Sequence, residues 1–290
     1  ILVALLSPVL WLLGLWPPLV FACLASACLA VLFLRARPKG FVVFAGCLFK
    51  DKGGEGSEEL SRVEGIHVLQ LNVTNDDDLR NALTYVKENL PPRGLWGIVN
   101  NAGVSNYGKV EWMSLDAFKW AAEVNLWGPI RARVVNVASV LGRMGAAQRG
   151  AYVLTKHGLE GLSDCLRYEM RRFGVHVCVI EPGNFVAATK ILTEDWVMKV
   201  AEEMWDGMDA EVKSDYGKED FDRTLQLQLS FCQSGLKDRT PVIRAMTSAL
   251  TDSHPLPRYQ ATTLYYRVRC FVATHLPEIV YEVLYERFRL

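Results

Sequence analysis

The sequence predicts an α/β fold: a doubly wound parallel sheet with helices on both faces, preceded by an N-terminal transmembrane helix. Three observations support this prediction. Apolar segments of strand length alternate with longer amphipathic segments through the middle of the chain. Asparagine, serine or glycine follows several of the apolar segments, as at the carboxyl edge of such a sheet. Residues 1–34 contain no charged side chain, which sets them apart from the rest.

The uncharged N-terminal segment is long enough to cross a bilayer, which takes about 20 apolar residues. Pro17 and Pro18 divide it, and we interpret the part from Gly14 or Leu15 to Leu34 as one spanning helix. The preceding piece would be a re-entrant segment, a second span or part of a targeting signal. A secretory signal peptide is the alternative, although the run is too long and lacks a small-residue cleavage site. Basic residues follow, so the body should lie on the cytosolic or matrix side.

The alternating elements follow in order. We expect strands at residues 41–45 and 67–73 and within 95–99, 133–137 and 175–180. We expect helices at 76–90, 114–128 and 151–174, with Thr74 or Asn75 and then Ser114 as N-caps and Gly174 as a C-terminal stop. The glycines at 53, 54 and 56 are interpreted as an ordinary loop, because no strand runs directly into them.

The pattern changes after the last of these strands. From residue 193 the chain becomes helical and mixed in charge, with a further helix expected in 240–255. Residues 265–288 are rich in aromatic residues and arginine, so they either touch lipid or pack in a core or subunit contact. We therefore divide the chain into a membrane anchor with its basic flank (1–38), a sheet core (39–192) and a helical substrate cap with the C-terminal region (193–290).

Composition limits the classes of partner. The 290 residues include 32 basic and 32 acidic side chains, so nothing indicates a nucleic-acid partner. The seven cysteines are scattered and form no C-x-x-C pair. We therefore expect reduced thiols, with neither a disulfide framework nor a metal site.

Three residues form the most specific chemical pattern. Tyr152 and Lys156 are four residues apart on one expected helix and so share a face, and Ser139 ends the preceding strand. A tyrosine hydroxyl titrates near pH ~10, and a nearby ammonium favours the phenolate and lowers that pKa. A serine hydroxyl can hold the substrate oxygen while the tyrosine exchanges its proton. This chemistry suits interconversion of an alcohol and a ketone, with a nicotinamide cofactor exchanging the hydride.

The chain resembles the short-chain dehydrogenase/reductase family over roughly residues 39–192. The resemblance rests on NNAG at 100–103, EVNLWG with Asn125, RVVNVAS ending at Ser139, AYVLTK with Tyr152 and Lys156, and EPGNF with Pro182 and Gly183. It implies a Rossmann-like fold and an oxidoreductase that uses NAD, with NADP not excluded.

The family implies roles for the matching positions. Ser139 would orient the substrate, Tyr152 would be the general acid and base, and Lys156 would lower the pKa of Tyr152 and hold the nicotinamide ribose. Asn125 would support a water-linked proton relay. The expected cofactor contacts are Asn72, Val73, Asn100, Ala102, Gly103, Tyr152, Lys156, Pro182, Gly183 and Thr189.

Further segments, such as LGRM, SDCLRYEM and VIEPGNFVAAT, resemble the branch of the family that converts (R)-3-hydroxybutyrate to acetoacetate. That resemblance implies the mitochondrial inner membrane, dependence on phosphatidylcholine and a homo-oligomer. The alternative branch comprises membrane-bound retinol and hydroxysteroid dehydrogenases, which implies the endoplasmic reticulum. Arg143, four residues beyond Ser139, is either a partner for a substrate carboxylate or a structural arginine.

The chain departs from the family pattern in two places. The glycine-rich loop T-G-x-x-x-G-x-G, which holds the cofactor pyrophosphate, does not occur in the sequence. We therefore expect the first strand, this loop and the first helix to be lacking, and 41–45 to be the second strand. Too few residues separate Asn125 from the strand at 133–137 for a full crossover, which takes about 10–12. A skipped exon or an incomplete gene model would explain both gaps.

These departures leave two expectations open. One is an oxidoreductase, because the chemical residues are all present, in a defective form that binds NAD poorly. The other is a catalytically inactive, membrane-tethered relative that has lost cofactor binding.

Overall fold

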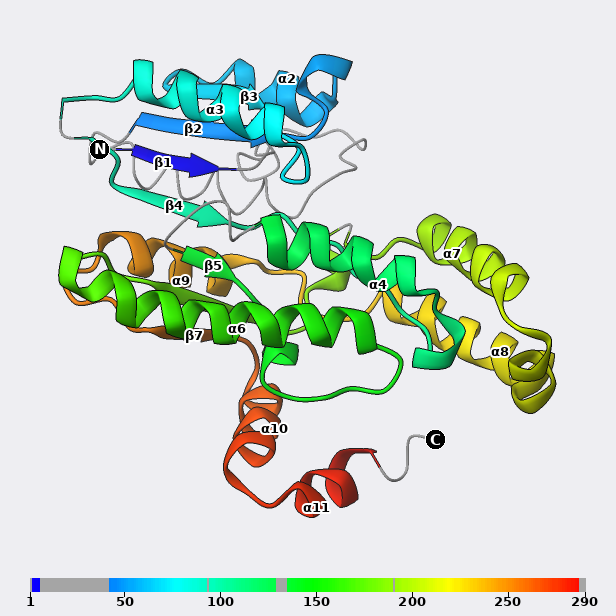
Figure 1. Cartoon of the computed structure of the whole chain (residues 1–290). Helices are drawn as coiled ribbons and strands as arrows, with labels where there is room; N and C mark the ends of the chain where they lie inside the picture. The colour runs from blue at the N-terminus through cyan, green and yellow to red at the C-terminus, as the bar shows by residue number, and fades with distance from the viewer. Residues whose placement is uncertain (1, 6–41, 93, 129–134, 190, 287–290) are drawn as a thin grey trace.

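A seven-stranded parallel sheet runs through the computed structural model, which describes residues 2–5, 42–92, 94–128, 135–189 and 191–286 (Figure 1). The strand order is β3-β2-β1-β4-β5-β6-β7, and every neighbouring pair is parallel. The strands are β1 (Leu2–Leu5), β2 (Val42–Cys47), β3 (Ile66–Gln70), β4 (Gly97–Asn100), β5 (Val135–Val137), β6 (Cys178–Pro182) and β7 (Arg258–Ala261). This order confirms the predicted Rossmann-like sheet.

Helices cover both faces of the sheet. The described residues form the α-helices α2 (Glu55–Ser61), α3 (Asp76–Glu88), α4 (Leu115–Ala122), α6 (Gly150–Met170), α7 (Glu194–Gly207), α8 (Ala210–Cys232), α9 (Thr240–Thr251), α10 (Leu264–His275) and α11 (Glu278–Tyr281). The predicted caps are confirmed: Asn75 and Ser114 accept backbone hydrogen bonds at the starts of α3 and α4, and Gly174 adopts a left-handed conformation after α6.

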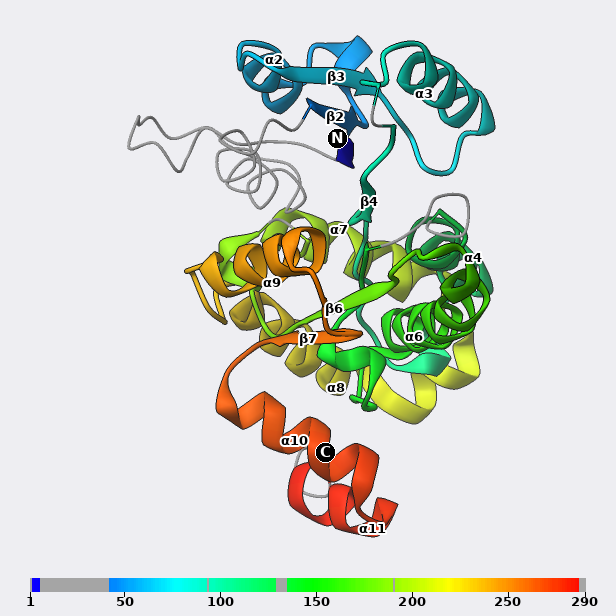
Figure 2. The ribbon, with the colours of Figure 1, turned by 90° about the vertical axis from the view of Figure 1, so that its left-hand side faces the viewer.

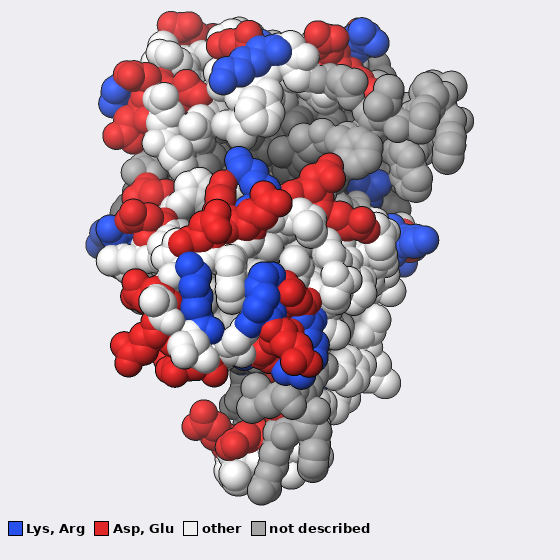
Figure 3. Space-filling view, turned by 90° about the vertical axis from the view of Figure 1, so that its right-hand side faces the viewer, with Lys and Arg blue, Asp and Glu red and all other residues white. Residues whose placement is uncertain are grey.

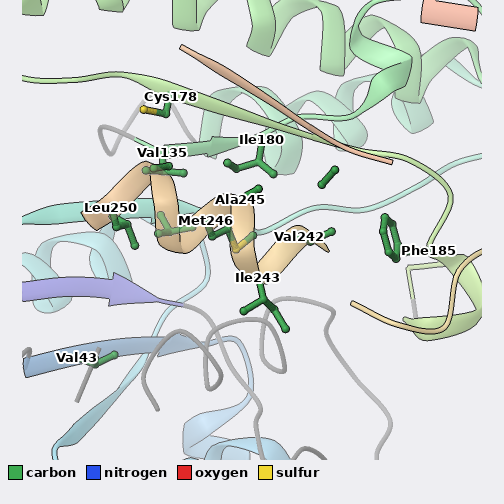
Figure 4. Close-up of a cluster of buried hydrophobic side chains, with 13 residues drawn as sticks. Val43, Val135, Cys178, Ile180, Phe185, Val242, Ile243, Ala245, Met246 and Leu250 are labelled. Carbon is green, nitrogen blue, oxygen red and sulfur yellow. The ribbon is translucent and has the colours of Figure 1, made fainter. Parts of the chain in front are cut away.

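The alternation of side chains along each strand explains why both faces are covered. In β6, Cys178 and Ile180 pack in the cluster formed with α9, whereas Val179 packs against Leu159 of α6. Figure 4 shows Met246 of α9 inserted among the strand residues of this cluster. Since both faces of each central strand are apolar, the strands are nearly continuous hydrophobic runs.

The prediction that the first strand is lacking was wrong. Residues 2–5 form β1, which pairs in parallel with β2 on one side and with β4 on the other. A short apolar segment such as residues 2–5 is compatible with a strand as well as with part of a membrane segment, and the pattern of apolar residues does not distinguish the two. The proposed spanning helix, the basic flank and the place of the missing loop and first helix fall within residues 6–41, outside the described residues.

In the part of the chain that the structure describes, no helix combines the length and apolar character needed to span a bilayer. The short connection that the sequence analysis singled out between Asn125 and the next strand lies mostly in 129–134, also outside the described residues.

The C-terminal region contributes a strand that was not predicted. β7 pairs with β6 and forms the outer edge of the sheet, so this region is joined to the core. Beyond β7, α10 and α11 project away from the body (Figure 2). On the side of the molecule where α7 and α8 lie, acidic and basic side chains are intermixed on the surface (Figure 3). There Lys109 reaches Asp220 of α8 at 2.5 Å, which ties the loop after β4 to this helical cover.

Candidate active site

Tyr152 and Lys156 lie one turn apart near the start of α6, as predicted from their spacing. The Lys156 ammonium lies 5.6 Å from the centre of the Tyr152 ring. It donates a hydrogen bond of 2.9 Å to the Val137 carbonyl at the end of β5. Lys156 is 4% exposed, and this burial lowers its pKa to about 8. A buried cation that titrates near neutral pH is typical of functional sites.

Ser139 follows β5 and lies beside both residues. Its Oγ accepts a hydrogen bond of 3.2 Å from the Leu141 amide and lies 3.5 Å from the Pro182 carbonyl at the end of β6. A hydrogen bond from the Ser139 hydroxyl to Tyr152 lowers the pKa of the phenol. The three residues named from the sequence are therefore brought together where β5, β6 and α6 meet.

The net pKa shift of Tyr152 differs from the prediction. Burial raises the pKa of Tyr152 and outweighs the lowering by the Ser139 hydrogen bond and by the positive charge of Arg149. Lys156 was predicted to lower it, but its ammonium is directed toward Val137. The positive charge that lowers the pKa of Tyr152 belongs to Arg149.

Asn125 lies in a π-helical turn, 123–127, that continues α4. It is fully buried, accepts a hydrogen bond from the Val104 amide at 2.8 Å, and donates to the Val104 carbonyl at 2.9 Å and to Thr155 of α6 at 3.1 Å. Such π-helical turns often occur at functional sites. Asn125 thus holds the loop after β4 against the helix that carries Tyr152.

A second set of polar contacts crosses beneath the site. Asn100 at the end of β4 donates to Asn136 of β5 at 2.7 Å, and Asn136 donates to Ser163 of α6 at 2.8 Å. Asn136 and Ser163 were not named by the sequence analysis, because a polar residue in a strand or helix carries no local signal of its partner. Their contacts fix the relative positions of the two strands and the helix.

Two glycines at the carboxyl edge of the sheet lie where a side chain would meet neighbouring atoms. A Cβ on Gly183 would lie 1.9 Å from Thr262 Oγ1, and a Cβ on Gly103 would lie 3.3 Å from Asn125 Oδ1 and 3.7 Å from Lys156 Nζ. The Thr262 hydroxyl is buried without a hydrogen-bond partner. Close approach of a ligand to the backbone is a common reason for glycine at such positions.

The remaining predicted cofactor residues line the same edge. Asn72 follows β3, and its side-chain oxygen accepts bonds from the Thr74 amide and hydroxyl at 3.0 and 2.8 Å. Val73 packs beside Gly128 at the end of the π-helical turn. Ala102 lies in the loop after β4, and Thr189 follows a short turn, Val186–Ala188, beyond Gly183.

Two arginines differ in their surroundings. The charge of Arg143 acts on Glu160 and Cys270. Arg149, by contrast, is buried at the start of α6, and its charge acts on Tyr152. Sequence reasoning missed Arg149, and its only signal is a position three residues before Tyr152.

The residues at this edge fit a nicotinamide cofactor on its nicotinamide side. The Lys156 ammonium, one of the donors expected to hold it, lies 3.7 Å from the place of a Cβ on Gly103 and 5.6 Å from the centre of the Tyr152 ring. Among the described residues, no group of three or more His, Cys, Asp or Glu is placed to hold a metal ion.

A doubly wound parallel sheet with serine, tyrosine and lysine at its carboxyl edge defines an oxidoreductase that acts on CH–OH groups with a nicotinamide cofactor. The chain belongs to the short chain dehydrogenase family, whose sequence profile matches residues 35–197.

Two related proteins and one solved structure are similar to the chain. The chain is 43% identical to the mitochondrial D-beta-hydroxybutyrate dehydrogenase of Rattus norvegicus over 264 residues, which cover 85% of this chain and 77% of the relative. It is 36% identical to retinol dehydrogenase 7 of Rattus norvegicus, covering 83% and 80%. A crystal structure of a short chain dehydrogenase/reductase from Burkholderia phymatum in complex with NAD has a similar fold, with a TM-score of 0.61, 16% identity and coverage of 84% and 89%.

Proposed function

We propose that the protein is an NAD-dependent dehydrogenase that interconverts (R)-3-hydroxybutyrate and acetoacetate. The observation that carries the activity is the meeting of Ser139, Tyr152 and Lys156 at the carboxyl edge of the sheet. The choice of substrate is supported by the similarity to D-beta-hydroxybutyrate dehydrogenase, which exceeds the similarity to retinol dehydrogenase 7.

The proposed mechanism assigns one task to each residue. Tyr152 gives its proton to the substrate oxygen during reduction and takes it back during oxidation. The Ser139 hydroxyl holds the same oxygen in place, and Lys156 holds the ribose and passes the proton onward. Asn125 holds the loop after β4 in register and supports the relay through water. When bound, the nicotinamide ring supplies or accepts the hydride.

The sequence contains no glycine-rich loop for the pyrophosphate, so we infer that this chain binds NAD weakly. We further propose a membrane-associated enzyme, at the mitochondrial inner membrane or alternatively the endoplasmic reticulum. The exposed apolar side chains of α10 and α11, among them Leu264, Phe271 and Ile279, support contact with lipid such as phosphatidylcholine or with a second copy.

The test is an assay of the purified protein against (R)-3-hydroxybutyrate, retinol and a hydroxysteroid, each with NAD and with NADP. We expect turnover of (R)-3-hydroxybutyrate with NAD, lost by a factor of about 1,000 or more in Tyr152→Phe, which keeps the ring and removes the proton. Turnover of retinol or of the steroid, without turnover of (R)-3-hydroxybutyrate, would contradict the proposed substrate. NADH titration by fluorescence measures the cofactor affinity, and micromolar binding would reject the inferred weakness.

A further inference from the structure

Arg149 is a buried charge without a carboxylate partner among the residues that the structure describes. Its side chain is among the buried polar groups at 9% exposed, and the ion pairs of the described residues include none to it. Charged side chains are seldom buried in proteins unless an opposite charge accompanies them, because burial removes their hydration. The guanidinium therefore has a requirement for an anion that the described protein does not meet.

The contacts of Arg149 are polar and aromatic but not acidic. One Nη donates to Gln228 Oε1 of α8 at 2.8 Å, and the guanidinium carbon lies 4.7 Å from the centre of the Phe231 ring. These contacts satisfy a part of its five donors and leave the charge uncompensated. Burial lowers the pKa of Arg149 to about 10, so the side chain remains a cation at neutral pH.

The backbone before α6 holds this side chain in a fixed place. Gln148 has a left-handed conformation with φ 64°, which non-glycine residues adopt rarely and at an energetic cost. Gly108 donates to the Gln148 carbonyl at 3.0 Å, and Gln228 donates to Gln148 Oε1 at 2.7 Å. The same Gln228 thus binds Arg149 and its neighbour, so α8 positions the arginine.

Arg149 lies next to the reacting group. It is the N-cap residue of α6, and Tyr152 occupies the first turn of the same helix. After burial, the largest influence on the pKa of Arg149 comes from Tyr152, which acts to raise it. In a 3-hydroxy acid a single methylene separates the carbinol carbon from the carboxylate carbon. An alcohol oxygen held by Tyr152 therefore requires that the carboxylate also lie close to it.

We propose that the Arg149 guanidinium binds the carboxylate of the substrate and makes the enzyme selective for short hydroxy acids, an inference that rests on the proposed function. Two parallel hydrogen bonds from the planar guanidinium would match the two carboxylate oxygens. The bound substrate would supply the missing counter-charge. This assigns to Arg149 the role that the sequence suggested for Arg143, whose charge acts on Glu160 and Cys270.

The test compares (R)-3-hydroxybutyrate with its neutral amide, (R)-3-hydroxybutanamide, in the wild type and in Arg149→Met. The matched control is Arg172→Met, an exposed arginine beyond the end of α6. We expect Arg149→Met to lose about 100-fold or more in kcat/KM for the acid, mainly through KM, because truncating one partner of a buried charge pair typically costs this much. Turnover of the amide should change little, as should both activities in Arg172→Met.

Equal loss on both substrates would overturn the proposal, since it would indicate a structural role. So would a selective loss for the acid in Arg143→Met together with none in Arg149→Met. If Arg149→Met does not fold, Arg149→Gln removes the charge and keeps the polar group near Gln228. The wild type gives a third test: if it does not prefer the acid to the amide, the proposal fails without any variant.

The proposed function can fail separately. If the wild type turns over retinol or a hydroxysteroid but neither (R)-3-hydroxybutyrate nor its amide, the proposed substrate is wrong. The carboxylate site at Arg149 would then be tested by comparing the Tm of the protein with sodium butyrate and with butanamide. A rise in Tm with butyrate alone, lost in Arg149→Gln, would retain the carboxylate site, and the absence of such a rise would reject it.

Discussion

Tyr152 holds its proton more tightly than a free tyrosine, because burial outweighs the Ser139 hydrogen bond and the Arg149 charge. At neutral pH the residue is therefore the protonated form, which is the form that reduction of a ketone requires. Oxidation of an alcohol requires the deprotonated form. The protonation state of this one side chain therefore makes the rates of oxidation and of reduction depend on pH in opposite senses.

We expect kcat/KM for alcohol oxidation to rise with pH through the alkaline range and kcat/KM for ketone reduction to fall. Ser139→Ala removes a hydrogen bond that favours the phenolate, so the oxidation profile should move upward by about one to two pH units. Initial rates measured across the pH range give both profiles. Ser230→Ala, an exposed serine on α8, is the control. A profile with its midpoint below neutral pH, or one that Ser139→Ala leaves in place, would contradict this assignment.

At the scale of elements, the site depends on how closely β6 and the segment after β7 approach each other. Gly183 donates its amide to the Ala261 carbonyl at 3.2 Å, and a Cβ at this position would overlap the Thr262 side chain. Pro182, directly before it, offers the carbonyl that faces Ser139. A displacement of this strand end would therefore move the serine that positions the substrate.

Gly183→Ala should lower the free energy of unfolding by about 1–3 kcal/mol, as over-packing usually does, and should also lower kcat/KM. The matched control is Gly161→Ala on the exposed face of α6, where a Cβ would meet nothing within 4 Å. That variant should gain about 0.5–1 kcal/mol, because alanine favours the helix. Urea denaturation measures both changes. Equal changes in the free energy of unfolding for the two variants would mean that the close contact between Gly183 and Thr262 does not affect stability.

The elements differ in how far the sequence reveals them. Helix α6 carries its own signals, namely an apolar face and a terminal glycine, so its position and its Tyr152–Lys156 pair were predicted closely. Strand β7 has the sequence RYQA, and a polar edge strand of this kind lacks the hydrophobic run from which a strand is predicted.

Other features depend on distant partners and therefore escape prediction from sequence. The net rise in the pKa of Tyr152 comes from burial, which spacing along a helix does not give. Arg149 becomes notable only because α8 covers it and no acidic side chain of the described residues pairs with it. The apolar β1 was assigned to the membrane because its pairing partners, β2 and β4, lie far along the chain.

For the whole molecule, one charged cluster joins the C-terminal region to the sheet core. Arg258 of β7 contacts Glu160 of α6 at 3.1 Å, Asp164 of α6 at 2.7 Å and Glu181 of β6 at 3.3 Å. Glu181 also accepts a hydrogen bond from Gln260 at 2.9 Å. Besides its backbone pairing with β6, the edge strand is therefore attached by one arginine that three carboxylates share.

The three carboxylates outnumber the two arginines that contact them, Arg258 and Arg167, and this excess of negative charge acts on the pKa of Glu160. Burial, then the charge of Glu181, raises the pKa of Glu160 to about 7, although Arg258 acts in the opposite direction. Burial also acts to raise the pKa of Asp164, but hydrogen bonds from Arg258 and Arg167 outweigh it and leave that pKa lowered. The two carboxylates of one helix therefore affect stability with opposite signs as pH changes.

The sign follows from proton binding. Between about pH 4.5 and 7 the folded state holds a proton on Glu160 that the unfolded state has released, so the contribution of Glu160 to stability falls as pH rises through this window. Glu160→Gln resembles the protonated form and should remove this loss. We expect the variant to match the wild type near pH 4.5 and to be more stable above pH 7 by up to about 3 kcal/mol.

Asp164→Asn is the control from the same helix, and it should behave in the opposite way. The lowered pKa of Asp164 contributes stability above its unfolded value, and that stability is lost as pH falls. Asp164→Asn should therefore weaken the protein at pH 8 and differ least from the wild type in acid. Urea denaturation at pH 4.5, 6 and 8 separates the two carboxylates. If Glu160→Gln were less stable than the wild type at pH 8, the ionised Glu160 would be needed to attach β7, and the excess of negative charge would not limit the stability of the fold.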